Sequence, residues 1–124
     1  MPPSGLEEFH EQYEDAADAE RRALSALSVQ ALLDRARNGR FGEYYQLWPV
    51  IAEKATLPQA GPVLLTVLES DAPYLTRYHC AAALLKLAGE PLAAFTPVSL
   101  SSGGPQAIRA NLDKIAAFLR GHTP

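Results

Sequence analysis

The sequence predicts an all-α fold, organised as a short α-solenoid of about three helix pairs with an extra acidic helix at the N-terminus. Three observations favour this fold. Apolar residues recur at helical spacings of three and four along most of the chain, and no segment alternates apolar and polar residues as a strand does. A pattern of residues also returns every 32 positions from residue 39 onward. Self-similarity at this period is typical of solenoids, in which each unit buries its apolar face by stacking on the next.

Length and composition suit one domain with a hydrophobic core. The chain has 124 residues, of which 48% are hydrophobic, so we expect residues 1–124 to form a single helical-repeat domain after a disordered tail at residues 1–5. One cysteine excludes an intramolecular disulfide and a thiolate metal cage. The N-terminus carries no basic residues followed by an apolar run, and no apolar stretch approaches the roughly 18 residues that span a bilayer. We therefore expect a soluble cytoplasmic protein without a membrane partner.

The first expected helix covers residues 6–26 and is acidic. Leu6, Phe9 and Tyr13 share one face of it at helical spacing. Residues 1–20 hold seven acidic residues and no base, whereas residues 21–124 hold the other seven acidic residues and all eleven bases. Two interpretations of these acidic residues stay open. They form the solvated side of an amphipathic helix, or they shield a basic surface and meet a basic partner.

A second helix and three repeat rows follow. Ser28 is a candidate N-cap for a helix over residues 29–37, which Asn38-Gly39 ends. The rows then begin at residues 39, 71 and 103, and their second helices are expected to start near residues 43, 73 and 105. Columns spaced three and four residues apart form the predicted buried face: Tyr44, Thr76 and Ile108; Trp48, Cys80 and Leu112; Ile51, Ala83 and Ile115; Ala55, Leu87 and Leu119.

The partner helix of each row is less uniform. Residues 62–70 are apolar nearly all round, which predicts a helix buried between neighbours. The equivalent segment over residues 92–100 contains Pro97 and runs into serines and glycines. We therefore expect a bent helix or an ordered loop in the second segment.

The best-preserved unit, residues 64–89, resembles a HEAT repeat of the short bacterial type. Its matching features are a Leu-rich first helix, Asp71 and Pro73 in the turn, Arg77 near the start of the second helix, and small residues with leucines after it. The resemblance extends over roughly residues 28–121, with specificity decreasing away from this unit. It implies a right-handed α-solenoid, and HEAT proteins are mostly binding scaffolds. A fold of this kind does not by itself determine function.

No motif for catalysis is present, so we do not expect an enzyme, a cofactor or a metal site. Glu7 and His10 have the spacing of two metal ligands on one helix face, but neither of the other histidines has an acid three residues before it. His79 and Cys80 are adjacent on an expected helix, so their side chains diverge by about 100° and cannot form a nucleophile–base pair. We predict no catalytic, cofactor-binding or metal-binding residue.

The outward face of the second helices is the candidate site for a partner protein. It carries apolar residues and a tyrosine where a solvent-exposed face is normally polar, and charged residues surround them. The predicted partner-binding residues are Tyr45, Gln46, Val50, Glu53, Lys54, Tyr78, Leu85, Lys86 and Lys114. We therefore expect a protein–protein interaction module, either an adaptor or an immunity-type inhibitor of a partner such as a cognate toxin. The competing explanation is that the N-terminal helix folds back and covers this face.

Nucleic-acid or anion binding is the alternative function. Lys54, Lys86 and Lys114 would lie with nearby arginines in a basic stripe along the second helices. Acidic residues such as Glu53 interrupt this stripe, which makes nucleic acid the less favoured partner.

Overall fold

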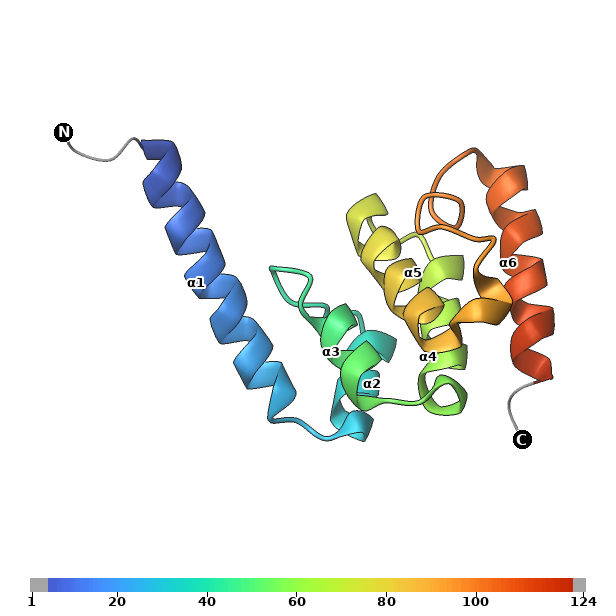
Figure 1. The fold of residues 1–124 in the computed structure, drawn as a ribbon, viewed down its shortest axis with the longest axis horizontal. Coiled ribbons are helices and arrows are strands. Elements are labelled where there is room, and N and C mark those ends of the chain that lie inside the picture. Colours follow the sequence, from blue (N-terminus) through green and yellow to red (C-terminus); the bar gives the residue numbers. More distant parts are fainter. Residues whose placement is uncertain (1–4, 122–124) are drawn as a thin grey trace.

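The structure, a computed structural model, describes the backbone of residues 5–121 and the side chains of residues 12–121. This part of the chain contains six α-helices, one short 3-10 helix and no strand, which confirms the predicted all-α class (Figure 1). The elements are α1 (Gly5–Ser25), α2 (Val29–Arg37), α3 (Leu47–Lys54), α4 (Leu57–Glu69), α5 (Tyr74–Ala88), η1 (Glu90–Leu92) and α6 (Pro105–Arg120). The tail predicted at residues 1–5 lies outside the described residues, apart from Gly5, which begins α1.

Local sequence signals determine where α2 and α4 begin. The Ser28 side chain accepts a hydrogen bond from the backbone N–H of Ala31 at 3.1 Å, so this serine is the N-cap predicted for α2. α4 begins five residues earlier than expected, because Thr56 and Gln59 form a capping box in which each side chain accepts from the other's backbone N–H. Pro62 therefore lies inside α4 rather than at its start.

The segment before α3 is a loop, so the helical turn that the register predicts there is wrong. α3 begins at Leu47 rather than near residue 43. Gly39, Gly42 and Tyr45 have positive φ angles of 73°, 84° and 62°, which a right-handed helix does not contain. Among the described residues, Tyr45 alone has this backbone without being a glycine.

In the central part of the fold, helices two places apart in the chain pack on each other. α2 packs on α4 and α3 packs on α5, so first helices meet first helices and second helices meet second helices. Nine of the twelve predicted positions are buried, and Trp48, Cys80 and Ile115 are fully enclosed, whereas Tyr44, Leu87 and Ile108 are partly exposed. The register therefore identifies most of the core-facing residues correctly.

α6 departs from the register. Residues 89–104 contain only η1 and turns, as their prolines, serines and glycines predict, so no first helix precedes α6. α6 packs on α4, which is apolar nearly all round, and it approaches α4 closely where Gly61 faces Leu119. Three complete stacked pairs are therefore not present in residues 5–121.

α1 lies against α3 with its C-terminal half only. Ala17 and Leu24 are buried, whereas the N-terminal half of α1 diverges from the other helices (Figure 1). With 21 residues, α1 is about 31 Å long. Neither α1 nor any other helix in the described part of the chain is long and apolar enough to cross a membrane.

Candidate functional site

All five tyrosines of the chain lie together on one surface. They come from α1, from the loop before α3 and from the first turns of α5. With one histidine they form the aromatic cluster: Tyr13, Tyr44, Tyr45, Tyr74, Tyr78 and His79. Tyr13 and Tyr74 are 43% and 42% exposed, so the cluster reaches the solvent.

Ring contacts connect the members of the cluster. Tyr13 meets Tyr44 edge to face, with 5.3 Å between ring centroids. Tyr45 stacks on His79 at 4.8 Å, and His79 in turn contacts Tyr78 at 5.4 Å. These separations lie in the range in which aromatic pairs attract each other beyond their buried area. Since the two loop tyrosines are neighbours in sequence, the rings join α1 to α5 through the loop.

One carboxylate of α1 holds the loop that carries two of these rings. The Glu20 side chain accepts hydrogen bonds from the backbone N–H groups of Glu43, Tyr44 and Gln46 at 2.7, 3.0 and 3.3 Å. Converging N–H groups of this kind form a nest, and the negative charge strengthens each hydrogen bond. The nest keeps Tyr45 at a φ of 62°, a conformation that costs a non-glycine residue roughly 1–2 kcal/mol.

Gly42 allows the loop to approach α1 this closely. Its φ is 84°, and a Cβ at this position would collide with the Glu20 carboxylate. A larger residue at position 42 would therefore displace either the loop or the carboxylate.

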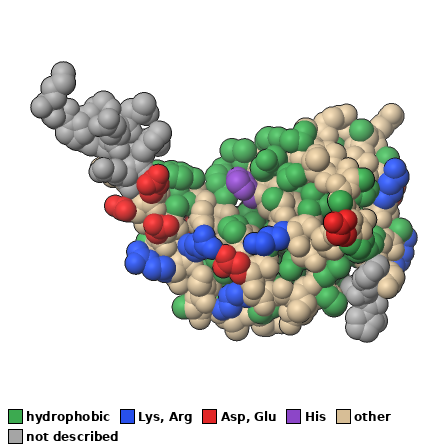
Figure 2. Space-filling model, in the orientation of Figure 1, with side chains coloured by type: hydrophobic (Ala, Val, Ile, Leu, Met, Phe, Trp, Pro, Cys, Tyr) green, Lys and Arg blue, Asp and Glu red, His purple; other side chains and the backbone are tan. Residues whose placement is uncertain are grey.

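Beside the aromatic cluster lies a groove of about 330 Å³ that runs between α1 and α5 across α3. We call it the aromatic groove, and its lining residues are Tyr13, Tyr44, Tyr45, Gln46, Pro49, Ala52, His79, Ala82, Ala83 and Lys86. Rings and small side chains therefore make up most of its surface. Figure 2 shows apolar side chains around the histidine on this face.

Two nitrogen-containing side chains contribute polar chemistry to the groove. Partial burial lowers the pKa of His79, because desolvation disfavours the charged imidazolium. The Lys86 ammonium is exposed and has no hydrogen bond or ion pair within residues 12–121. The tyrosine hydroxyls of the cluster likewise have no hydrogen bond within that range. The groove thus combines apolar surface with an unpaired cation and free hydroxyl groups.

Four of the nine predicted partner-binding residues lie at this groove. Tyr45, Gln46 and Lys86 line it, and Tyr78 adjoins it through its contact with His79. The structure therefore brings together residues from the first and second repeat rows, as the prediction of a common outward face requires.

Val50 was predicted to be on the surface, and this is wrong. It is fully buried, because α1 packs over the outward side of α3. The same helix engages the residues on either side, since Arg21 pairs with Glu53 and Lys54 donates to the Ser25 carbonyl at 2.7 Å. The outward face was expected either to bind a partner or to be covered by the N-terminal helix. On α3 it is covered by α1, whereas on α5 it is accessible to a partner.

Leu85 and Lys114 do not line the aromatic groove. Leu85 packs partly against the core, and Lys114 is exposed on α6, which packs on α4. The basic stripe is not assembled either, because Lys54 is engaged by the α1–α2 corner and Lys114 lies outside the α3–α5 layer.

Sequence reasoning did not identify Tyr13, Tyr44 and His79 as site residues. The adjacent pair of tyrosines at positions 44 and 45, and the tyrosines four residues apart in α5, were signals of an aromatic surface. No sequence pattern indicated that Tyr13 would meet them, because that contact depends on the docking of Glu20 against the loop.

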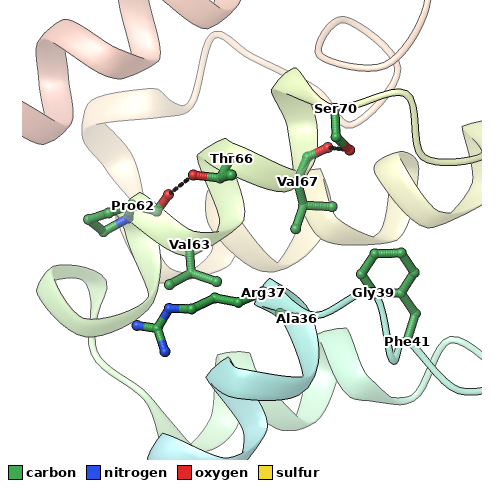
Figure 3. A pocket seen from close by; sticks show the side chains of 9 residues that line it. All are labelled: Ala36, Arg37, Gly39, Phe41, Pro62, Val63, Thr66, Val67 and Ser70. Carbon is green, nitrogen blue, oxygen red and sulfur yellow. Dashed lines mark hydrogen bonds between the residues drawn. The ribbon is translucent and has the colours of Figure 1, made fainter.

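A larger groove of about 510 Å³ lies between α2 and α4, and we call it the α2–α4 groove (Figure 3). Its lining residues are Ala36, Arg37, Gly39, Phe41, Pro62, Val63, Thr66, Val67 and Ser70. The polar groups here are already paired: the Thr66 hydroxyl donates to the Pro62 carbonyl at 3.0 Å, and Arg37 pairs with Asp34 at 2.8 Å. Among the described side chains no free polar group converges on this groove, so it offers less to a partner than the aromatic groove does.

The described side chains form no arrangement for metal or nucleophilic chemistry. No group of three His, Cys, Asp or Glu side chains among them could hold a metal ion. Cys80 is enclosed, its thiol donates to the Leu64 carbonyl at 3.3 Å, and burial raises its pKa, so it is not a reactive thiolate. The Glu7–His10 pair lies outside the side chains that the structure describes.

Comparison of the chain with protein-family models, with curated proteins and with solved structures gave no match in any of the three. The resemblance to HEAT repeats therefore stays a prediction from the residues. The aromatic groove is the feature of the chain that indicates its function.

Proposed function

We propose that the chain is a non-enzymatic protein-binding module and that its partner binds at the aromatic groove. The observation that carries this proposal is the gathering of all five tyrosines, with the unpaired Lys86, at one hollowed surface. An adaptor and an immunity-type inhibitor of a partner such as a toxin are the two forms of this function that suit a small helical chain.

Tyrosine favours this function for physical reasons. Its ring provides a large contact area with only two torsions to immobilise, and its hydroxyl can exchange water for a polar group of a partner. Tyrosine is accordingly enriched at protein interfaces and among the residues that contribute most to binding. Within residues 12–121, two of the four exposed large hydrophobic side chains, Tyr13 and Tyr74, belong to the cluster.

We further propose that the scaffold is a short HEAT-like solenoid with a reduced C-terminal unit. Two features support this proposal. The first helices of the two pairs, α2 and α4, pack on each other, and so do the second helices, α3 and α5. α6 occupies the end of the array as a single helix without a partner helix before it. A single terminal helix of this kind would cap the core of the last complete pair.

Nucleic-acid binding is the alternative function, and one observation favours it. Rings next to a lysine offer a platform on which unpaired bases stack. Lys86 is the one lysine or arginine in the lining, however, and α1, which contributes Tyr13 to the groove, carries the exposed acidic residues Glu14, Asp15 and Asp18. These carboxylates would repel phosphates, so a protein partner is favoured.

Photo-crosslinking in the organism of origin tests the proposed function. The photoreactive residue p-benzoylphenylalanine replaces Ala82 in the aromatic groove and, as a matched control, Thr66 in the α2–α4 groove. We expect the variant at position 82, but not the control, to crosslink to one protein of defined mass. Tyr78→Ala and Lys86→Glu should weaken that crosslink without changing thermal unfolding. A crosslink to nucleic acid, equal crosslinking at both positions or none at position 82 would contradict the proposal.

A further inference from the structure

We infer that the aromatic groove binds a single amphipathic α-helix of the partner protein, and that this helix presents an acidic residue to Lys86. The inference rests on the proposed function and adds to it the secondary structure and charge of the bound segment. Three properties of the groove carry it: the internally bonded backbone of the helices α3 and α5, the small residues at its base, and an ammonium without a partner within residues 12–121.

The helices α3 and α5, which form the base of the groove, do not suit a partner that needs backbone hydrogen bonds. α3 and α5 bond their own backbone groups within each helix, and the Gln46 side-chain amide already donates to the Tyr44 carbonyl at 3.1 Å. An extended strand docked here would leave its N–H and C=O groups without partners. A helix satisfies its own backbone and requires only complementary side chains.

Small residues at the base of the groove allow another helix to approach. Ala52 of α3 lies with Ala82 and Ala83 of α5 in the lining, and none of them has an atom beyond Cβ. Helices with small side chains at the contact pack at the short end of the usual range, about 8 Å between axes. The groove volume of about 330 Å³ is at the lower end of the range of ligand pockets and is large enough for one or two inserted side chains.

The helices that flank the groove are longer than the helix between them. α3 has 8 residues and is about 12 Å long, whereas α5 has 15 residues and is about 22 Å long. α1 and α5 both pack on α3 and extend past its N-terminal end, where Tyr13 and Tyr74 are exposed. A helix of about four turns laid along α5 would contact the alanines and the rings together.

Lys86 determines the charge of the bound helix. It lies two turns of α5 after His79, which is about 10 Å along the helix axis. Glu53 on the adjacent α3 is paired with Arg21, so it does not neutralise this lysine. A carboxylate two turns from the residue that contacts the rings would therefore pair with Lys86, whereas a lysine or arginine there would be repelled.

Synthetic peptides and NMR of the full chain test the inference. The probes are a leucine-based amphipathic helix of about four turns with glutamates beside its apolar face, the same peptide with lysines instead, and a proline-rich peptide of equal length. We expect the glutamate peptide to shift the backbone amides of Ala52, Ala82 and Lys86 and to bind about tenfold more tightly than the lysine peptide. Lys86→Glu should reverse this order, and Lys86→Gln should remove the difference. The amides of Val63 and Val67 in the α2–α4 groove serve as the internal control.

Several outcomes would overturn the inference. Equal binding of both charged peptides, tighter binding of the proline-rich peptide, or shifts confined to the α2–α4 groove would each show that the bound segment is not an acidic helix. Sedimentation that shows a dimer with these groove amides protected would identify a second copy of the chain as the occupant, and would equally overturn it. The photo-crosslinking result is independent of these peptides, so failure of the proposed function is recognised separately.

Discussion

The aromatic groove and the α2–α4 groove differ in volume and in what lines them, and the smaller is the better candidate. The α2–α4 groove measures about 510 Å³ against about 330 Å³, yet its hydroxyl and guanidinium groups are bonded within the chain. The aromatic groove offers rings, hydroxyl groups and an ammonium that no described residue engages. Free polar groups beside apolar surface, rather than volume, therefore distinguish a binding surface from a gap between packed helices.

The two grooves also differ in how they are held in shape. Buried residues of the core pairs, such as Ala36 and Val67, form the α2–α4 groove, so its shape follows from the packing that folds the chain. The aromatic groove depends on one carboxylate, Glu20, and on a loop tyrosine in a disfavoured backbone conformation. Strain of this kind persists only where surrounding contacts impose it, and it is often found at functional sites. Substitutions in the two grooves should therefore differ in their effects on stability and on binding.

The largest contrast is expected in the free energy of unfolding. Val67 in the α2–α4 groove is 5% exposed, so Val67→Ala removes two buried methyl groups and should lower stability by about 2–3 kcal/mol. Ala82→Gln in the aromatic groove changes a half-buried helical position and should alter stability by less than about 0.5 kcal/mol. Urea unfolding followed by circular dichroism measures both. Similar losses for the two variants would show that the aromatic groove is part of the core.

A smaller loss is expected when the nest is removed. Glu20→Ala leaves three backbone N–H groups without their acceptor and should lower stability by about 1–3 kcal/mol. Asp18→Ala, two residues earlier at an exposed position of the same helix, is the matched control and should change stability by less than about 0.5 kcal/mol. Gly42→Ala should reproduce the effect of Glu20→Ala from the loop side. If the nuclear Overhauser contacts between Tyr45 and His79 survive both changes, the nest does not position the rings.

Substitution of Tyr45 should change binding of the peptide without a comparable change in the free energy of unfolding. Tyr45→Gly relieves about 1–2 kcal/mol of backbone strain and loses a ring contact of about 0.5–1.5 kcal/mol, so the net change in stability should stay within about 1 kcal/mol. Binding of the glutamate peptide should nevertheless fall, whereas Tyr45→Phe should preserve it. Unfolding curves and peptide titrations of the same samples make the comparison. Unchanged binding by Tyr45→Gly would remove this ring from the proposed site.

The smallest expected effect is a dependence of stability on pH. The folded chain lowers the pKa of His79 from its ordinary value of 6.5, so the unfolded chain binds the proton more readily. Stability should therefore be complete above pH 6.5 and should decrease as the pH falls toward the lower folded pKa. His79→Gln should remove this part of the pH dependence, and subtracting its curve from that of the unchanged chain eliminates the other histidines. NMR titration of the His79 ring measures the shift directly, and a folded pKa above 6.5 would reverse the sign.

The sequence predicted those parts of the fold that depend on periodicity and caps. Apolar spacing identified the buried columns around Trp48 and Cys80, and the Ser28 cap and the Asn38-Gly39 stop placed α2 at its observed bounds. The start of α3 was mispredicted because the loop conformation depends on Glu20, which lies 27 residues before Leu47 in the sequence. The burial of Val50 escaped prediction for a similar reason, since the helical pattern does not show which face another helix will cover.

The candidate site was predicted only where it follows the repeat register. Gln46, Tyr78 and Lys86 share the outward face of successive second helices, and the structure places them at or beside one groove. Lys114 shares its register column with Ala82 of the groove, but no first helix precedes α6, and α6 packs on α4. The packing of α1 and α6 at the two ends of the repeat region depends on contacts between segments far apart in the sequence, and the sequence pattern did not predict it.

Lys54 holds the corner about which α1 would tilt. Its ammonium donates to the backbone carbonyls of both Ser25 and Leu27, and so clamps the corner at which α1 ends. Because α1 is about 31 Å long, a tilt of about 10° at this corner displaces its far end by about 5 Å. Tyr13, the α1 residue that lines the groove, lies about 18 Å along α1 from this corner, so the same tilt would change the groove width by about 3 Å.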